Sequence, residues 1–183
     1  MRFSGRIVVM GFGSIGSGLM PLLFDHFEEP RVSVVTSDSR NAEIAREYGV
    51  EHRVEAVTRE NYVRILEDNL REGDFLVNLS VDVDCLDLLT WCSDRGVLYT
   101  DTVIEPWGGY YTDASLPVEQ RSNYFLRERV LAERARRGGG PTAIIAHGAN
   151  PGLVSHFTKG EGSKAFGAQW YALTPTGVVI DKG

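Results

Sequence analysis

The sequence has little that would suit a membrane-spanning, secreted or nucleic-acid-binding protein. Hydrophobic residues make up 43% of its 183 residues, but no apolar run approaches the roughly 20 residues needed to cross a bilayer. The N-terminal residues lead straight into a predicted strand with no secretory hydrophobic region, so we expect a cytoplasmic protein. The net charge of −6 lacks the basic excess of proteins that bind nucleic acids. It is compatible with a cationic ligand.

Cysteine is also scarce. The two cysteines, Cys85 and Cys92, lie seven residues apart in a predicted helix, which separates them by about 10.5 Å along the helix axis. That distance is too long for a disulfide. Neither a C-x-x-C nor an H-x-x-x-H spacing occurs, so we expect no metal site. We interpret the two cysteines as buried thiols on the core face of the helix.

Glycine, in contrast, occurs in an informative pattern near the N-terminus. Residues 8–16 read V-V-M-G-F-G-S-I-G, a hydrophobic run that ends in Gly11-x-Gly13-x-x-Gly16. The run follows a predicted strand at 6–10 and opens a predicted helix at 14–27, which is the context in which this spacing indicates a dinucleotide site. Gly11 would allow a tight turn, Gly13 the approach of a pyrophosphate, and Gly16 close packing of the helix on the sheet. The alternative is a tight strand–helix turn without a ligand.

Strands and helices alternate along the first hundred residues. Further strands are predicted at 32–36, 52–57, 75–80 and 97–102, and further helices at 41–48, 58–70 and 83–94, the second of them capped by Thr58. Because the strands are almost continuously apolar, we expect a parallel sheet covered on both faces. Right-handed crossovers would make this an α/β Rossmann-type doubly wound sheet, with a ligand crevice at the C-terminal ends of the strands.

The later elements are predicted from weaker patterns. Residues 117–137 indicate one long helix with six arginines, which we interpret as a solvated face rather than an anion site. Its apolar face would consist of Val118, Phe125, Val130 and Leu131. Residues 142–147 predict a sixth strand, which leads into a G-A-N-P-G turn that opens another helix at Leu153.

Four motifs in combination resemble homospermidine synthase, which belongs to the saccharopine dehydrogenase-like group. They are M-G-F-G-S-I-G, N-L-S-V-D at 78–82, Y-T-D-T-V-I-E-P-W at 99–107 and H-G-A-N-P-G-L-V-S at 147–155. The resemblance covers about residues 3 to 159 and implies that residues 1–159 form a Rossmann-like NAD-binding domain.

The sequence departs from this family after Lys159. Homospermidine synthases continue after G-A-N-P-G with a large second domain, which supplies the rest of the substrate pocket. Here that catalytic domain is largely absent, and residues 160–183 form a short unassigned tail with a predicted hairpin at 168–173 and 177–181. A hairpin cannot replace such a domain. We therefore expect an NAD-binding half-enzyme with weak or no turnover on its own.

The resemblance implies a reaction in polyamine biosynthesis. A hydride leaves the amine-bearing carbon of putrescine, ammonia is exchanged for a second amine at the imine, and the same NADH reduces the new imine without net redox change. The expected partner is therefore a small diamine or polyamine. Carboxylates suit such a substrate because they pair with ammonium groups and relay protons.

Four residues that follow predicted strands match the family's catalytic site: Asp82, Glu105, Trp107 and Asn150. Asp82 is either an amine ligand or the N-cap of the following helix. Glu105 is predicted to be an ammonium anchor or an acid–base group, and Trp107 either stacks on a cation or simply packs. Asn150 either bonds to the nicotinamide amide or the substrate, or forms a turn. His147 is either a base or a structural hydrogen-bonding residue.

Cofactor contacts are expected where the strands end. The glycine loop and the resemblance assign them to Gly11, Phe12, Gly13, Ser14, Ile15, Gly16, Asn78, Ser80 and Thr102. Asp38 lies at a suitable distance from the glycines to bind ribose hydroxyls, although it is about two residues past the usual strand-end position. Arg40 could instead meet a 2′-phosphate. The resemblance favours NAD over NADP.

Two other functions stay open. A dehydrogenase of the saccharopine or carboxynorspermidine type would join an amine to a keto acid or aldehyde. Its carboxylate substrate would need an Arg or Lys clamp, and none lies beside Glu105 or Asn150 in the sequence. The other function is a non-catalytic NAD-binding module, whose exposed apolar surface would favour a homo-oligomer or a partner protein.

Overall fold

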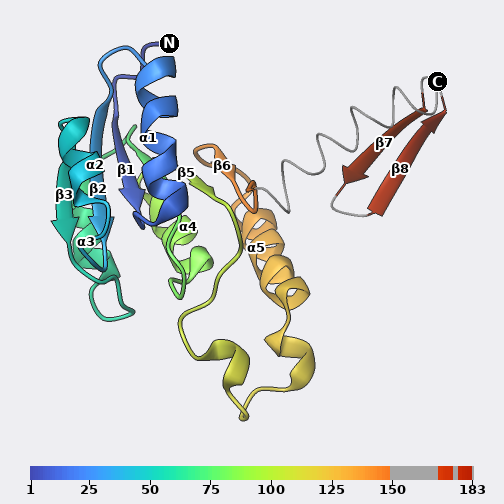
Figure 1. Cartoon of the computed structure of the whole chain (residues 1–183). Coiled ribbons are helices and arrows are strands. Elements are labelled where there is room, and N and C mark those ends of the chain that lie inside the picture. The colour runs from blue at the N-terminus through green and yellow to red at the C-terminus, as the bar shows by residue number, and fades with distance from the viewer. Residues whose placement is uncertain (149–168, 175–176, 183) are drawn as a thin grey trace.

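A computed structural model describes residues 1–148, 169–174 and 177–182 of the chain (Figure 1). Its main body is a six-stranded, all-parallel sheet with the strand order β3-β2-β1-β4-β5-β6. The strands are β1 (Arg6–Met10), β2 (Arg31–Thr36), β3 (Glu51–Val54), β4 (Phe75–Asn78), β5 (Leu98–Asp101) and β6 (Ala143–Ile144). This order confirms the predicted doubly wound fold. A separate antiparallel hairpin of β7 (Gln169–Thr174) and β8 (Gly177–Lys182) agrees with the predicted hairpin.

Helices cover both faces of the parallel sheet (Figure 1). They are α1 (Ser14–His26), α2 (Ala42–Glu47), α3 (Tyr62–Asn69), α4 (Cys85–Asp94) and α5 (Asn123–Arg137), with the 3₁₀ turns η1 (Tyr110–Thr112) and η2 (Val118–Arg121). Ile7 and Val9 of β1 pack with buried residues of α1 and α2. Val8 and Met10 pack with those of α3, α4 and α5. This burial on two faces explains why the strand is apolar throughout.

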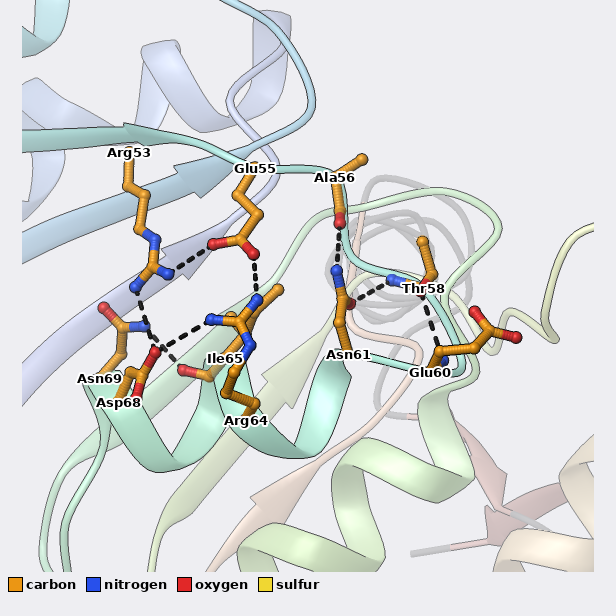
Figure 2. A network of polar contacts seen from close by, with 10 residues as sticks. All are labelled: Arg53, Glu55, Ala56, Thr58, Glu60, Asn61, Arg64, Ile65, Asp68 and Asn69. Atoms are coloured by element: carbon orange, nitrogen blue, oxygen red, sulfur yellow. Dashed lines mark hydrogen bonds and ion pairs between the residues drawn. The ribbon is translucent and has the colours of Figure 1, made fainter.

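The helix predicted to begin directly after Thr58 begins at Tyr62. Asn61 Oδ1 accepts a hydrogen bond from the Thr58 backbone N–H at 2.7 Å, and Asn61 Nδ2 donates to the Ala56 carbonyl at 2.9 Å. Figure 2 shows how these bonds hold residues 56–61 as a turn before α3. Thr58 Oγ1 accepts from the Glu60 backbone N–H within this turn. Thr58 is therefore a turn residue, and the prediction that it caps the helix was wrong.

Two other helix starts also differ from the prediction. The N-cap of α4 is Asp84, whose side chain accepts hydrogen bonds from the backbone N–H groups of Leu86 and Asp87. The alternative that Asp82 caps this helix was therefore wrong. Residues 117–137 are divided at Ser122, which is extended (φ −123°, ψ 151°) and caps α5 by accepting from the Phe125 N–H. Val118, predicted on the apolar face of one long helix, is 72% exposed.

The sixth strand is shorter than predicted and ends at Ile144. Ala146 adopts a left-handed φ of 52°, and its N–H bonds to the side chain of Asp101 at 2.6 Å instead of continuing the sheet. Cys85 and Cys92 are both fully buried, as predicted. Burial raises the pKa of the Cys92 thiol to about 12. In the described part of the chain, no helix has the length and apolar character needed to span a membrane.

Candidate functional site

The C-terminal ends of the parallel strands bring most of the predicted site residues to one edge of the sheet. The glycine loop follows β1, Asp38 follows β2, Ser80 and Asp82 follow β4, and residues 102–107 follow β5. His147 and Gly148 follow β6. Doubly wound sheets bind their ligands in the crevice at this edge.

Different structural requirements explain why glycine occupies each of the three positions in the loop. Gly11 has a left-handed φ of 91°, and a Cβ there would lie 2.8 Å from the backbone of Leu79 and Ser80. A Cβ on Gly16 would lie 2.5 Å from the Gly11 carbonyl oxygen. A Cβ on Gly13 would have no described protein atom within 4 Å. Packing therefore explains the first and third glycines, whereas the second faces open space, as expected of a backbone that a ligand approaches.

The N-terminus of α1 is suited to an anion. Within the described residues, no side chain caps this helix and its first turn carries no acidic residue. The first amides of an α-helix have no partner inside the helix, and the helix dipole places positive charge there. Ile15 in this turn is 63% exposed, and Val81 beyond β4 is 73% exposed. Uncapped amides beside the open Gly13 fit the phosphates of a dinucleotide.

Asn41 was not recognised as a site residue in the sequence. Its Nδ2 donates a 3.0 Å hydrogen bond to the carbonyl oxygen of Phe12, inside the glycine loop. Asn41 has a left-handed φ of 60° and precedes α2, so it ties the end of β2 to the loop after β1. Asparagine tolerates this conformation better than most residues, but the sequence pattern does not reveal the bond across 29 positions.

Asp38 and Arg40 form a pair in the loop after β2. The Asp38 carboxylate accepts hydrogen bonds from the Arg40 backbone N–H at 2.9 Å and from its guanidinium at 2.7 and 3.0 Å. These bonds lower the pKa of Asp38. The carboxylate is therefore ionised at neutral pH and able to accept bonds from sugar hydroxyls.

Asn78 and Ser80 lie together at the end of β4. Asn78 is 2% exposed, and its Oδ1 accepts hydrogen bonds from the Ser80 hydroxyl at 2.5 Å and the Ser80 backbone N–H at 3.2 Å. Ser80 is half-buried and borders Gly11, as the short Cβ distance above indicates. The predicted contacts from β1 and β4 are thus side by side.

Asp82 and Glu105 form an acidic pair beside this edge. Asp82 is exposed and has a left-handed φ of 60°. Left-handed backbone at a residue other than glycine is uncommon and is often found at functional sites. Glu105 is half-buried; burial and the charge of Asp82 both raise its pKa. A carboxyl of this kind can bind an ammonium group, and its raised pKa makes it a better proton acceptor than an ordinary glutamate.

Trp107 forms one wall of a cleft of about 580 Å³, and Asp82 lies on the same cleft. The ring is 7% exposed, and its Nε1–H donates to the Asp87 carboxylate at 2.7 Å. The Arg59 guanidinium carbon lies 6.0 Å from the ring centroid. Glu60, Asp113 and Arg59 also line the cleft, so it has more acidic than basic residues. An aromatic face among carboxylates is suited to a cation.

The segment after β6 is described only as far as Gly148. A Cβ on Gly148 would lie 2.9 Å from both the Cβ and the carbonyl oxygen of Thr102, so the two residues are in close contact. The His147 backbone N–H donates to the Asp101 carbonyl at 3.0 Å. Asn150 and the helix predicted at Leu153 lie outside the described residues.

Comparison with known proteins gives this arrangement a family. Residues 7–144 match the family described as "Saccharopine dehydrogenase NADP binding domain". The chain belongs to this family. Its predicted resemblance to the saccharopine dehydrogenase-like group is thereby confirmed.

Two curated relatives are homospermidine synthases. The enzyme of Blastochloris viridis is 47% identical over 163 residues, covering 86% of this chain and 34% of the relative. That of Mesorhizobium japonicum is 43% identical over 163 residues, with the same two shares. The chain therefore spans about a third of the length of the curated relatives it matches.

Solved structures agree with this similarity. Homospermidine synthase from Legionella pneumophila, crystallised in complex with NAD, matches with a TM-score of 0.78 and 36% identity, covering 91% of this chain and 35% of that chain. Apo saccharopine dehydrogenase (L-Glu forming) from Saccharomyces cerevisiae matches with a TM-score of 0.56 at 15% identity, covering 89% and 32%. The second match shows the fold alone.

Proposed function

We propose that this chain binds NAD at the C-terminal edge of the sheet and is the dinucleotide-binding part of a homospermidine synthase-like enzyme. The observation that carries the proposal is the open backbone at Gly13 beside the uncapped N-terminus of α1. These groups would hold the pyrophosphate. Ser80 and Thr102 would contact the other half of the cofactor. The similarity to homospermidine synthases supports the same function.

The Asp38–Arg40 pair supports NAD rather than NADP. The ionised Asp38 carboxylate would accept hydrogen bonds from the adenosine ribose hydroxyls. A 2′-phosphate would bring negative charge next to this carboxylate, which is unfavourable. Arg40 offsets this repulsion only in part, because its guanidinium is already paired with Asp38 at 2.7 Å.

The acidic residues of the cleft, with Glu105 close to Asp82, support a diamine substrate. We propose that Asp82 and Glu105 bind the ammonium groups of putrescine and that Trp107 contributes a cation–π contact. Glu105 would also take and return the proton of the reacting amine, because its raised pKa is closer to neutrality than that of an ordinary glutamate. We also propose that Asn150 bonds to the nicotinamide amide or the substrate.

The proposed reaction has no net redox change. A hydride leaves the amine-bearing carbon of putrescine, the resulting imine exchanges ammonia for a second amine, and the new imine regains the hydride. NAD, when bound, supplies the acceptor and donor for that hydride. In this proposal Asp82 and Glu105 hold the diamine, and Glu105 moves the amine proton.

The test is a calorimetric titration of the purified chain with NAD and, separately, with NADP. We expect one-to-one binding with a lower Kd for NAD. Failure to bind either dinucleotide would contradict the proposed cofactor site. Tighter binding of NADP would leave the site in place but contradict the role given to Asp38.

A further inference from the structure

A chain of hydrogen bonds runs beneath the candidate cofactor site through buried side chains of β4 and β5. Asn78 Nδ2 donates to the Tyr99 hydroxyl at 3.3 Å, and that hydroxyl donates to Asp101 Oδ2 at 2.9 Å. Asn78, Tyr99 and Asp101 are each no more than 2% exposed. The chain connects Ser80, beside the glycine loop, with the start of the segment after β6.

The direction of every bond in this chain is determined by its two ends. The Ser80 backbone N–H can only donate, so Asn78 must present its Oδ1 to Ser80 and its Nδ2 to Tyr99. At the other end, an ionised Asp101 can only accept, so Tyr99 must donate to it. The Ser80 hydroxyl donates its single proton to Asn78 Oδ1. Ser80 Oγ is therefore left as a hydrogen-bond acceptor.

Asp101 also bonds to the polypeptide segment that follows β6. Its Oδ1 accepts from the Ala146 N–H at 2.6 Å, and its backbone carbonyl accepts from the His147 N–H at 3.0 Å. The Cys85 thiol of α4 lies near the Asp101 carboxylate, since each group affects the pKa of the other. Asp101 thus joins β5 to the segment after β6, and Tyr99 joins it to Asn78 of β4.

We propose that Asp101 is a positioning residue for the cofactor site. By accepting the Tyr99 O–H, it holds Tyr99, and through it the Asn78 amide, in the place where Asn78 Oδ1 takes the Ser80 hydroxyl proton. Ser80 Oγ is then an acceptor for an N–H or O–H group of the cofactor. The proposal rests on the proposed function, because it assumes that NAD lies against Ser80. It adds a residue that does not itself touch the cofactor. Sequence reasoning assigned no role to Tyr99 or Asp101.

Burial makes this series of hydrogen bonds depend on pH. It raises the pKa of Asp101 to about 6, against 3.8 for an ordinary aspartate. Among the described residues, the titratable groups that face Asp101 are Tyr99 and Cys85. Burial raises the pKa of both, so both stay protonated in this range. A protonated Asp101 would present a donor to Tyr99, which would leave the tyrosine O–H without its acceptor. NAD binding should therefore weaken as the pH falls through about 6.

The test is the NAD dissociation constant of the full chain between pH 5.5 and 8 for the wild type, Y99F, D101N and the control Y111F. Tyr111 donates its hydroxyl to Asn123 Oδ1 at 2.7 Å in an exposed position, so Y111F removes a tyrosine hydroxyl and its hydrogen bond outside the Asn78–Tyr99–Asp101 series. We expect Y99F and D101N to bind NAD about tenfold more weakly at pH 7.5, the effect of losing about one buried hydrogen bond. Y111F should bind like the wild type.

The pH profile separates positioning from general loss of structure. In the wild type the Kd should rise below pH 6, whereas Y99F and D101N should lack this rise. Thermal unfolding of each variant shows whether the protein is folded at the temperature of the titration. If folded Y99F or D101N binds NAD with the wild-type affinity and pH profile, the positioning role is wrong although NAD binding stands. If the wild type does not bind NAD, both proposals are overturned.

Discussion

Replacing single glycines in the loop after β1 separates the ligand-binding role from the packing role. Gly13 has φ −76° and ψ −156°, a backbone that alanine adopts, and its Cβ would meet no described protein atom within 4 Å. We therefore expect G13A to change the free energy of unfolding by less than about 1 kcal/mol, since the weaker N-cap of alanine and the smaller chain entropy of the unfolded state oppose each other. The added methyl group would occupy the space in which the pyrophosphate approaches.

Gly16 provides the matched control. Its Cβ would lie 2.5 Å from the Gly11 carbonyl oxygen and 3.2 Å from Phe12 Cδ2. The first contact is to backbone, so the turn itself must move. Overpacking of this kind costs about 1–3 kcal/mol. In a domain of this size each kcal/mol lowers Tm by about 2–4 °C.

The assay is thermal unfolding of the apo chain together with calorimetric titration by NAD. We expect G13A to keep the wild-type Tm within about 2 °C and to bind NAD at least about tenfold more weakly, the effect of losing about 1.4 kcal/mol. We expect G16A to lower Tm clearly. The reasoning is refuted if G13A binds NAD normally, because the open space at Gly13 would then have no ligand. It is also refuted if G13A is as unstable as G16A.

Three further predictions follow from charges at the site. D38A should weaken NAD binding by about 10- to 100-fold, the usual range for a hydrogen bond to a charged group, and improve NADP binding by freeing Arg40. Titration with both dinucleotides measures the ratio of the two Kd values, and an unchanged ratio would contradict the role of Asp38. E105Q should weaken putrescine binding to the NAD-loaded chain, and putrescine binding by the wild type should strengthen as the pH rises through the raised pKa of Glu105. E128Q on α5 is the control. Equal loss of putrescine binding in both variants would exclude a specific role for Glu105. Burial raises the pKa of Asp101 to about 6 in the folded chain, against 3.8 for an ordinary aspartate. The stability of the folded chain therefore falls as the pH rises from about 4 to about 6 and the buried carboxyl ionises. The Tm of D101N minus that of the wild type should therefore be larger at pH 7.5 than at pH 5. A difference that does not vary with pH would contradict the raised pKa.

Local patterns were sufficient for most of the fold. Apolar strands alternating with helices predicted the parallel sheet, and the glycine spacing predicted the turn after β1. Helix starts were harder, because they depend on which polar side chain reaches a free N–H. Asp82 and Asp84 are both reasonable caps from the sequence, and only the structure shows that the Asp84 carboxylate accepts from the first free N–H groups. Ser122 divides the predicted long helix for the same reason, since its hydroxyl accepts from the Phe125 N–H.

The sequence by itself determined the fold class, the glycine loop and a set of polar residues at strand ends, because each depends on residues close together in the chain. The tertiary structure alone decided how these residues combine. Asn41 bonds to Phe12 across 29 positions, and Ala146 bonds to Asp101 across 45. Burial of Asp101 and Glu105, and hence their raised pKa values, depends on neighbours from several elements. Contacts and desolvation of this kind arise only when strands distant in sequence pair, and for that reason local patterns do not contain them.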